Sequence, residues 1–269
     1  MAYALSIVIP ALNEQDNVGP LVDEVQHHVR GADPPVDAEL IVIDDGSTDD
    51  TRPRLQALQA GRPWLRVLSR PTPQGQSSAM AAGIAAANAP LIATLDADLQ
   101  NDPAELPAMM RMLLDQGLDL VQGDRSADRQ DTAVRRYASG IGRKARLWVL
   151  GDRIRDTGCS ARVVKTELVR NMPLHFKGMH RFFPAYAALQ GARIGEMPVR
   201  HRARAHGQSK YGLGLLNRGS AGLFDLFAVR WMRKRYRPIE AQEVFAAAET
   251  DAVPSPHSAP AQAAVEPAP

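Results

Sequence analysis

The sequence predicts an α/β domain with a mostly parallel sheet and helices on both of its faces. Two observations predict it. Short apolar runs alternate with helix-spaced segments from the N-terminus to about residue 122, with short links between them. Acidic side chains directly follow two of these runs, at 44–45 and 96–98. Because ligands bind at the carboxyl ends of parallel strands, the pattern also predicts where a site lies.

The elements follow in order along the chain. Strands are predicted at residues 5–9, 39–43, 65–68, 91–95 and 118–122, where the runs are short and rich in Val, Ile and Leu. Helices are predicted between them at 16–30, 48–60, 76–87 and 103–116. The second half is less regular, with a helical pattern at 126–151, a loop at 156–162, a helix at 182–190 and a strand at 193–200.

Three parts are expected. Residues 1–211 form the α/β domain, and residues 212–237 hold two amphipathic segments. Residues 238–269 are rich in Ala and Pro and are expected to be disordered. No apolar run reaches about 18 residues, so no transmembrane helix is predicted.

Charge and cysteine content narrow the function classes. The formal net charge is +2, but no Lys or Arg follows Arg237, so the body of the chain is more basic than the whole. A basic body favours an anionic partner such as phosphate, nucleic acid or a membrane surface, although a solvated surface gives the same charge. The single cysteine, Cys159, excludes a disulfide framework within the chain and a Cys-rich zinc site.

Asp96 and Asp98 are the candidate metal ligands. They lie two residues apart directly after a predicted buried strand, so both can reach one Mg²⁺ or Mn²⁺ ion. Such an ion neutralises the charge of a leaving diphosphate. The alternative is a polar turn in which an Asp caps the next helix.

The loops after the first two strands should lie side by side. Asp44 and Asp45 can accept hydrogen bonds from a ribose or a base, and Asn13 or Glu14 can contact the base. The alternative is that Asp-Gly makes the turn and a neighbouring Ser or Thr caps the helix.

Two later segments also carry candidate site residues. Residues 200–212 are the best candidate for binding an anion, because several Arg and Lys side chains lie beside a glycine, although a solvated basic loop has the same composition. Asp156 lies in a predicted loop, where it can act as a base, orient an acceptor or make another turn. Cys159 is interpreted as a packing residue rather than a nucleophile.

Taken together, these segments resemble the inverting family-2 glycosyltransferases of the GT-A fold. Among these the chain looks most like the polyprenyl- and dolichol-phosphate sugar synthases, including dolichol-phosphate mannose synthase. The resemblance covers roughly residues 5–215. The matching segments are 7–10 with Asn13 and Glu14, 42–49, 96–100, 123–125 with Arg129, Asp131, Arg135 and Arg136, 156–159 with Arg162, and His201, Arg204, Gly207, Ser209, Lys210 and Tyr211.

The resemblance implies roles for individual residues. Pro10, Leu12, Glu14 and Asp45 would line the nucleoside. Asp96 and Asp98 would hold the metal and the diphosphate, with Gln100 as a further metal ligand. Arg204 and Lys210, with Ser209 beside them, would bind phosphate groups. Arg125 would lie on the acceptor side, and Asp156 would lie near the acceptor.

The function expected from these features is transfer of a sugar from a GDP- or UDP-sugar to a polyprenyl phosphate, with inversion. A divalent cation is the expected cofactor. A peripheral location on the cytoplasmic face of the membrane is expected from the apolar and basic segment 213–237. The alternative is a pair of helices that packs on the domain or forms a dimer contact. Nucleic acid is not an expected partner, because the basic stretches lack interleaved aromatic residues. The alternatives are a transferase for a sugar hydroxyl, which needs a base such as Asp156, and a non-catalytic nucleotide-sugar-binding module.

Overall fold

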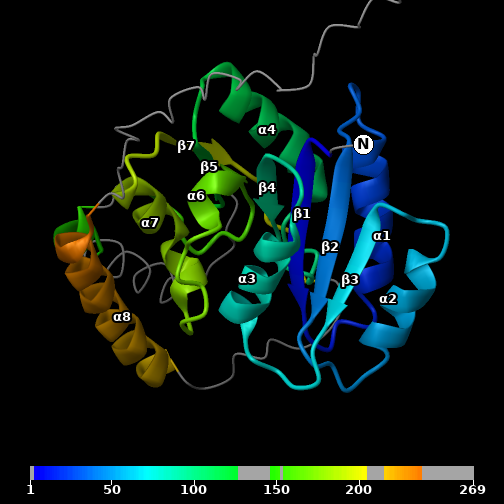
Figure 1. Ribbon diagram of the computed structural model, residues 1–269, viewed down its shortest axis with the longest axis horizontal. Helices are drawn as coiled ribbons and strands as arrows, with labels where there is room; N and C mark the ends of the chain where they lie inside the picture. The colour runs from blue at the N-terminus through cyan, green and yellow to red at the C-terminus, as the bar shows by residue number, and fades with distance from the viewer. Residues whose placement is uncertain (1–2, 127–145, 152–153, 205–214, 238–269) are drawn as a thin grey trace, which may run out of the picture. The chain divides into compact units, whose positions relative to one another are not determined.

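The computed structural model describes residues 3–126, 146–151, 154–204 and 215–237, with side chains in the last range from residue 224 onward. Its centre is a seven-stranded sheet in the order β3-β2-β1-β4-β6-β5-β7 (Figure 1). The strands are β1 (Leu5–Ala11), β2 (Ala38–Asp44), β3 (Leu65–Ser69), β4 (Leu91–Thr94), β5 (Leu120–Asp124), β6 (Arg162–Lys165) and β7 (Ile194–Pro198). The predicted class, a mostly parallel sheet flanked by helices, is confirmed.

One strand differs from the prediction. The predicted loop at 156–162 is present from 156 to 161, but no strand is predicted after it, whereas β6 begins at Arg162 and runs antiparallel between β4 and β5. Only four residues form this strand, too few to show a clear period in the sequence. The other strand pairs are parallel, so β1, β2, β3 and β4 all present their carboxyl ends at the same edge of the sheet.

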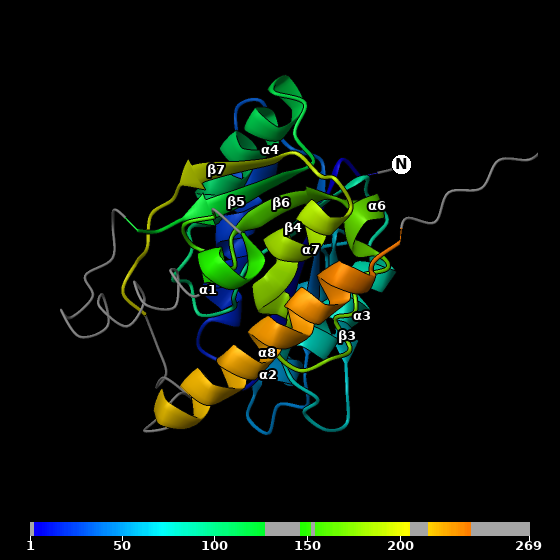
Figure 2. The same ribbon diagram turned by 90° about the vertical axis from the view of Figure 1, so that its left-hand side faces the viewer.

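Helices cover the two faces of the sheet as two layers (Figures 1 and 2). Odd-numbered residues of β1, such as Ile7 and Ile9, pack with one layer, and Val8 packs with the other, as the two-residue period of a strand requires. The first layer contains α1 (Val18–Val25), α2 (Thr51–Gln59) and α4 (Leu106–Asp115). The second contains α3 (Gln76–Ala86), α6 (Thr166–Val169), α7 (Phe183–Leu189) and α8 (Leu215–Arg235).

Helix α3 approaches the sheet closely because its residues are small. A Cβ atom on Gly83 would lie 2.4 Å from Val8 Cγ1 and 2.6 Å from Ile43 Cδ1, so a larger residue there would push α3 off β1 and β2. The close packing sets the N-terminus of α3, with Gly75 and Gln76, beside the carboxyl ends of those strands.

The C-terminal region differs in part from the prediction. Two amphipathic segments are predicted between 212 and 237, and the structure has one helix there, α8. Short helices complete the fold, namely η1 (Gln26–Arg30), which continues α1, η2 (Pro103–Glu105) and η3 (Met179–Phe182). Across the part of the chain that the structure describes, no helix combines the length and apolarity needed to cross a bilayer. The predicted disordered tail, 238–269, lies outside the described residues.

Candidate functional site

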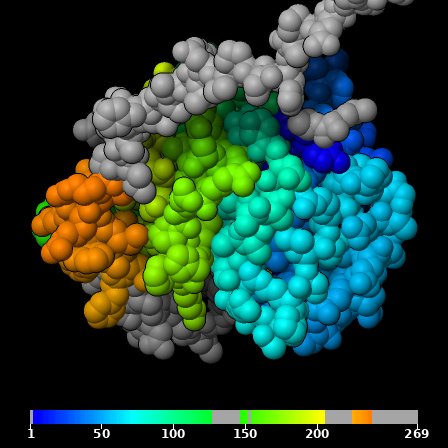
Figure 3. All heavy atoms as spheres, viewed as in Figure 1, coloured from blue at the N-terminus to red at the C-terminus, as the bar shows by residue number. Residues whose placement is uncertain are grey.

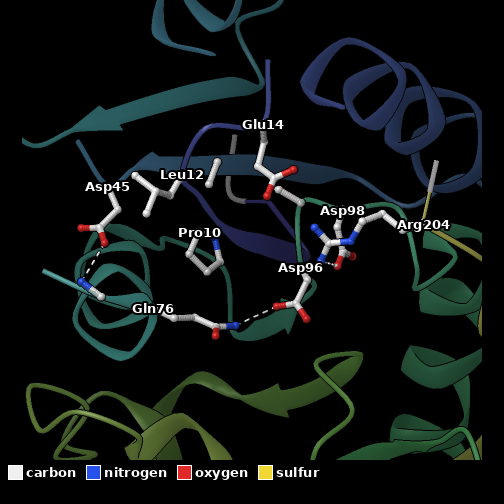
Figure 4. Close-up of a pocket in the computed structure, with 11 residues that line it drawn as sticks. Pro10, Leu12, Glu14, Asp45, Gln76, Asp96, Asp98 and Arg204 are labelled. Atoms are coloured by element: carbon white, nitrogen blue, oxygen red, sulfur yellow. Dashed lines mark hydrogen bonds and ion pairs between the residues drawn. The ribbon is translucent and has the colours of Figure 1, made fainter. Parts of the chain in front are cut away.

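A cavity of about 300 Å³ lies at the carboxyl ends of β1, β2 and β4. Its lining comes from five separate segments of the chain (Figure 4). The segments after β1, β2 and β4 meet there because these strands are parallel. Seven of the predicted site residues are brought together in this lining: Pro10, Leu12, Glu14, Asp45, Asp96, Asp98 and Arg204. Gly75, Gln76, Ala11 and Ala97 complete it.

The loops after β1 and β2 brace each other. Asn13 Oδ1 accepts a hydrogen bond from the Thr48 N–H at 2.8 Å, and the Asn13 N–H donates to Ser47 Oγ at 2.9 Å. Asn13 has a φ of +50°, a conformation that Asn tolerates better than most residues. It does not line the cavity, so its place in the structure is that of a brace between two loops that do.

Asp44 and Asp45 have different surroundings although they are neighbours. Asp44 is fully buried, lies outside the cavity lining, and accepts hydrogen bonds from the Ser47 N–H, Arg52 Nε and Ser69 Oγ. Burial alone would raise the pKa of Asp44, but these hydrogen bonds outweigh it and lower the pKa below its usual value. Asp44 therefore stabilises the turn as an ionised carboxylate.

Asp45 lines the cavity and holds the loop that precedes α3. Its carboxylate accepts hydrogen bonds from the Gln74 N–H at 3.1 Å and the Gly75 N–H at 2.7 Å. The turn after β2 requires a glycine at position 46. The φ of Gly46 is +76°, and a Cβ atom on this residue would lie 2.6 Å from the Thr72 carbonyl carbon. The loop that leads into α3 is thus fixed against the end of β2.

Asp96 and Asp98 form the acidic end of the cavity (Figure 4). Gln76 Nε2 donates to Asp96 Oδ1 at 2.7 Å, and Arg204 Nη2 pairs with Asp98 Oδ2 at 2.7 Å. Burial and the neighbouring Asp98 carboxylate raise the pKa of Asp96. Leu99, the next residue, has a φ of +60°, which is strained for a leucine and marks a backbone held in place by its surroundings.

These residues suit a hard divalent cation. Both carboxylates face one cavity, and carboxylate oxygens are the ligands that Mg²⁺ and Mn²⁺ prefer. Among the described residues, no three His, Cys, Asp or Glu side chains cluster as a metal site. Two carboxylates are nevertheless sufficient where a substrate phosphate supplies further ligands. Gln100, the third predicted ligand, is not part of the lining, and its Nε2 lies 3.5 Å from the Arg202 carbonyl oxygen.

Asp156 and Arg125 form a buried ion pair outside the cavity lining. Asp156 Oδ2 accepts from Arg125 Nε at 2.8 Å, and Asp156 Oδ1 accepts from Arg125 Nη2 at 3.2 Å and from the Gly158 N–H at 3.1 Å. The exposed fractions of the two side chains are only 7% and 9%. The structure therefore places these two predicted residues together. Neither lines the cavity, although the charge of Arg125 acts on Asp96, which does.

Two buried cations, Arg125 and Arg162, lie close enough to Asp96 for their charges to offset part of the rise in its pKa. Arg162 donates to the carbonyl oxygens of His180 and Cys159, and its guanidinium lies 4.6 Å from the centre of the Phe183 ring. Burial lowers the pKa of Arg162 to about 10, so the side chain stays charged at neutral pH. The positive charges of Arg125 and Arg162 thus lie close to the acidic end of the cavity.

Gln76 is a site residue that the sequence analysis did not single out. It was assigned only to the start of a helix, yet it contacts Asp96 directly. The available signal was its position: it follows Gly75 in the third loop of the strand-helix series, at the same edge of the sheet as the acidic loops. Ser209 and Lys210, like Arg129, Asp131, Arg135 and Arg136, lie outside the described residues.

Cys159 is fully buried, and burial raises the pKa of its thiol to about 11. Because the thiolate is the reactive form, we expect the folded protein to resist iodoacetamide at pH 8. Mass spectrometry should find alkylation only after urea is added. Rapid labelling of the folded protein, at the rate of a small-molecule thiol, would show that the thiol is accessible and ionised.

Comparison with solved structures defines the class to which this fold belongs. Glucosyl-3-phosphoglycerate synthase from Mycobacterium tuberculosis, in complex with Mg²⁺ and UDP, aligns over 88% of this chain and 81% of its own, with a TM-score of 0.60 and 23% sequence identity. A complex of the same protein with Mn²⁺, UDP and glucosyl-3-phosphoglycerate aligns with a TM-score of 0.58 and 23% identity, over the same shares of both chains. The GT-A type of fold that the resemblance implied is confirmed.

Residues 6–179 match the family model Glycosyl transferase family 2, and the chain belongs to that family. Dodecaprenyl-phosphate galacturonate synthase from Rhizobium johnstonii is 38% identical over 239 residues, which are 87% of this chain and 69% of that protein. Undecaprenyl-phosphate 4-deoxy-4-formamido-L-arabinose transferase from Edwardsiella ictaluri is 37% identical over 212 residues, 78% of this chain and 63% of that protein. The chain therefore spans about two thirds of the length of these two proteins. Their names and the family match confirm the resemblance to family-2 glycosyltransferases of the polyprenyl-phosphate sugar synthase type.

Proposed function

We propose that this protein transfers a sugar from a nucleoside diphosphate sugar to a polyprenyl phosphate, with inversion at the anomeric carbon. The observation that carries the proposal is the cavity, in which two carboxylates and an arginine lie at one end and Pro10, Leu12 and Asp45 at the other (Figure 4). The end with two carboxylates and an arginine suits a cation and a diphosphate. The end with Pro10, Leu12 and Asp45 suits a nucleoside. The names of the two relatives supply the acceptor class.

The donor half of the reaction depends on the acidic end. Asp96 and Asp98 would hold a divalent cation, which when bound neutralises charge on the leaving diphosphate. Gln76 holds the Asp96 carboxylate in its orientation through the 2.7 Å hydrogen bond. Arg204, now paired with Asp98, has the fork-shaped donor set that binds phosphate oxygens. The chain thereby stabilises the charge that develops as the sugar–oxygen bond breaks.

The acceptor half needs no strong base in this proposal. A phosphomonoester has a second pKa near 6 and is largely dianionic at pH 7, so positioning and charge stabilisation dominate. Arg125 is the cation assigned to the acceptor side, and Asp156 holds its guanidinium by two hydrogen bonds. We therefore assign Asp156 to the orientation of Arg125 rather than to proton abstraction.

A turnover assay tests the proposal. The protein is incubated with Mn²⁺ and a panel of UDP- and GDP-sugars, after a thermal-shift screen has found which donors raise its apparent stability. Undecaprenyl phosphate is compared with free sugar acceptors. We expect a glycosylated lipid phosphate with the opposite anomeric configuration to the donor. Product on a sugar hydroxyl alone would favour the alternative transferase, and donor binding with no product on any acceptor would favour a non-catalytic module.

The outer face of α8 supports a further part of the proposal, peripheral contact with a membrane. Phe224, Phe227 and Trp231 follow one another at helical spacing and are 76%, 50% and 59% exposed, while Leu226 and Val229 on the other side are buried. Trp148, in the segment held against α8 by a hydrogen bond from Arg230 to the Val149 carbonyl oxygen, is 82% exposed. Figure 3 shows α8, in orange, at the surface.

The basic residues beside these rings favour contact with an anionic membrane. Arg230, Lys234 and Arg235 are exposed on α8, next to the aromatic face. Aromatic rings favour the membrane–water interface, and basic residues are attracted to the anionic lipids of the cytoplasmic leaflet. A second copy of the same basic face would be repelled. We therefore propose that α8 rests on the cytoplasmic face of an anionic bilayer.

Replacement of Phe224, Phe227 and Trp231 by Ser should abolish flotation with vesicles that contain phosphatidylglycerol, because it removes the apolar area that enters the interface. Leu114→Ser is the control, since Leu114 is 56% exposed on α4, in the opposite helix layer. The wild type and the control should float, and salt should weaken their binding. Equal recovery of the triple variant with lipid would contradict the assignment.

A further inference from the structure

The side chain of Arg202 joins three separate parts of the fold. Its Nη1 atom donates to both carboxylate oxygens of Glu24, each at 2.9 Å, and its Nη2 atom donates to Asp102 Oδ2. Glu24 lies on α1, and Asp102 Oδ1 accepts the Ala104 N–H at the start of η2. A planar guanidinium that engages two carboxylates at once fixes direction as well as distance.

Main-chain contacts place this side chain next to the cavity. The Arg202 N–H donates to the Gln100 carbonyl oxygen at 2.9 Å, and His201 forms a β-bridge with Asn101. Upstream, the Val199 N–H donates to the Asp124 carbonyl oxygen at 3.0 Å. Residues 201 and 202 therefore lie along the loop that follows Asp98, and Val199 lies beside the end of β5.

Arg204 follows two residues later and reaches Asp98 in the cavity. Its position depends on how firmly the chain just before it is held. Without Arg202, the carboxylates of Asp102 and Glu24 would lose their shared cation, and Asp102 is only 5% exposed. The segment would then lose its two charged contacts with Glu24 and Asp102, and Arg204 would spend less time in the geometry that binds an anion.

We propose that Arg202 is a positioning residue that holds Arg204 at the phosphate end of the donor cavity through its contacts with Glu24 and Asp102. Arg202 does not line the cavity itself. This inference rests on the proposed function, because it gives the cavity a nucleoside diphosphate as its ligand.

The competing explanation is an ion pair that contributes only to stability. Lys165 and Asp119 provide the comparison, since their ion pair is 2.7 Å long and its cation is 38% exposed, as Arg202 is. Lys165 is the last residue of β6, and it pairs with Leu91, the first residue of β4. Lys165 therefore lies at the opposite end of β4 from the cavity. Exposed ion pairs of this kind contribute little to stability.

A double-mutant cycle separates the two explanations. Binding of UDP and of GDP, each with Mn²⁺, is measured by calorimetry for the wild type, Arg202→Ala, Arg204→Ala, the double variant and Lys165→Ala. We expect Arg202→Ala to weaken binding of the preferred nucleotide about tenfold. The double variant should bind no more weakly than Arg204→Ala, because Arg202 acts through Arg204. Arg202→Lys should recover part of the loss, and Lys165→Ala should match the wild type.

Three other binding results would overturn the role of Arg202. Unchanged affinity in Arg202→Ala, or losses that add in the double variant, would overturn the inference while leaving the proposed function intact. A loss as large in Lys165→Ala would show a general effect of stability and would also overturn it. If the wild type binds neither nucleotide with Mn²⁺, the proposed function fails, and the inference fails with it.

Discussion

Asp98→Asn is expected to lower kcat/KM for sugar transfer by about 10³-fold or more, because in the proposed reaction the variant loses an anionic ligand of the cation that would stabilise the leaving diphosphate. The shape of the side chain is kept, and the pair with Arg204 is replaced by a neutral contact. Steady-state rates with Mn²⁺ varied over a wide range measure the effect. The loss should persist at saturating Mn²⁺, since charge and not only affinity has been removed.

The control for this prediction is Asp115→Asn, an exposed carboxylate at the end of α4 that should leave the rate unchanged. Thermal unfolding of both variants checks that the fold is kept. Transfer by Asp98→Asn at the wild-type rate, with the same dependence on Mn²⁺, would refute the assignment of Asp98 to the cation.

Asp156→Asn is expected to lower the free energy of unfolding by about 3–5 kcal/mol, because it leaves the buried Arg125 guanidinium without its counter-charge. Urea unfolding at pH 7 measures the change. The fraction that remains folded should still transfer sugar to a phosphate acceptor at a substantial rate, since the dianionic acceptor needs no base.

Asp16→Asn provides the matched comparison. Its carboxylate pairs with Arg54 at 3.1 Å, but both side chains are about half exposed, so the loss should stay below about 1 kcal/mol. Near-total loss of transfer by folded Asp156→Asn, with donor binding intact, would instead assign Asp156 to base catalysis. An unchanged free energy of unfolding would contradict the account of the buried pair.

The first half of the fold was predictable because its signals are local. Val, Ile and Leu runs mark β1, β2 and β4, and each ends at a polar residue or a turn residue. Since parallel strands bring their carboxyl ends together, the sequence alone places the residues that follow β1, β2 and β4 at one edge of the sheet. The cavity lining gathers Pro10, Asp45 and Asp96 at that edge.

What the sequence did not reveal depends on distant partners. Asp156 and Arg125 are 31 residues apart, and Arg202 and Glu24 are 178 apart, so neither pair has a local signal. The same limit applies to Asn13, whose brace to Thr48 looks in the sequence like a contact available to a ligand. Short β6 escaped notice because four residues next to a loop carry too little periodicity.

In the proposed reaction, Asp96 and Asp98 hold a cation that carries the phosphates of a nucleotide sugar. Crystals grown with Mn²⁺ and the donor that gives the largest thermal shift test it most directly, with data collected at a wavelength where manganese scatters anomalously. We expect an anomalous peak in contact with both carboxylates and the diphosphate, with Arg204 turned to a phosphate oxygen. Bound donor with its diphosphate elsewhere, or no manganese between it and these two carboxylates, would contradict it.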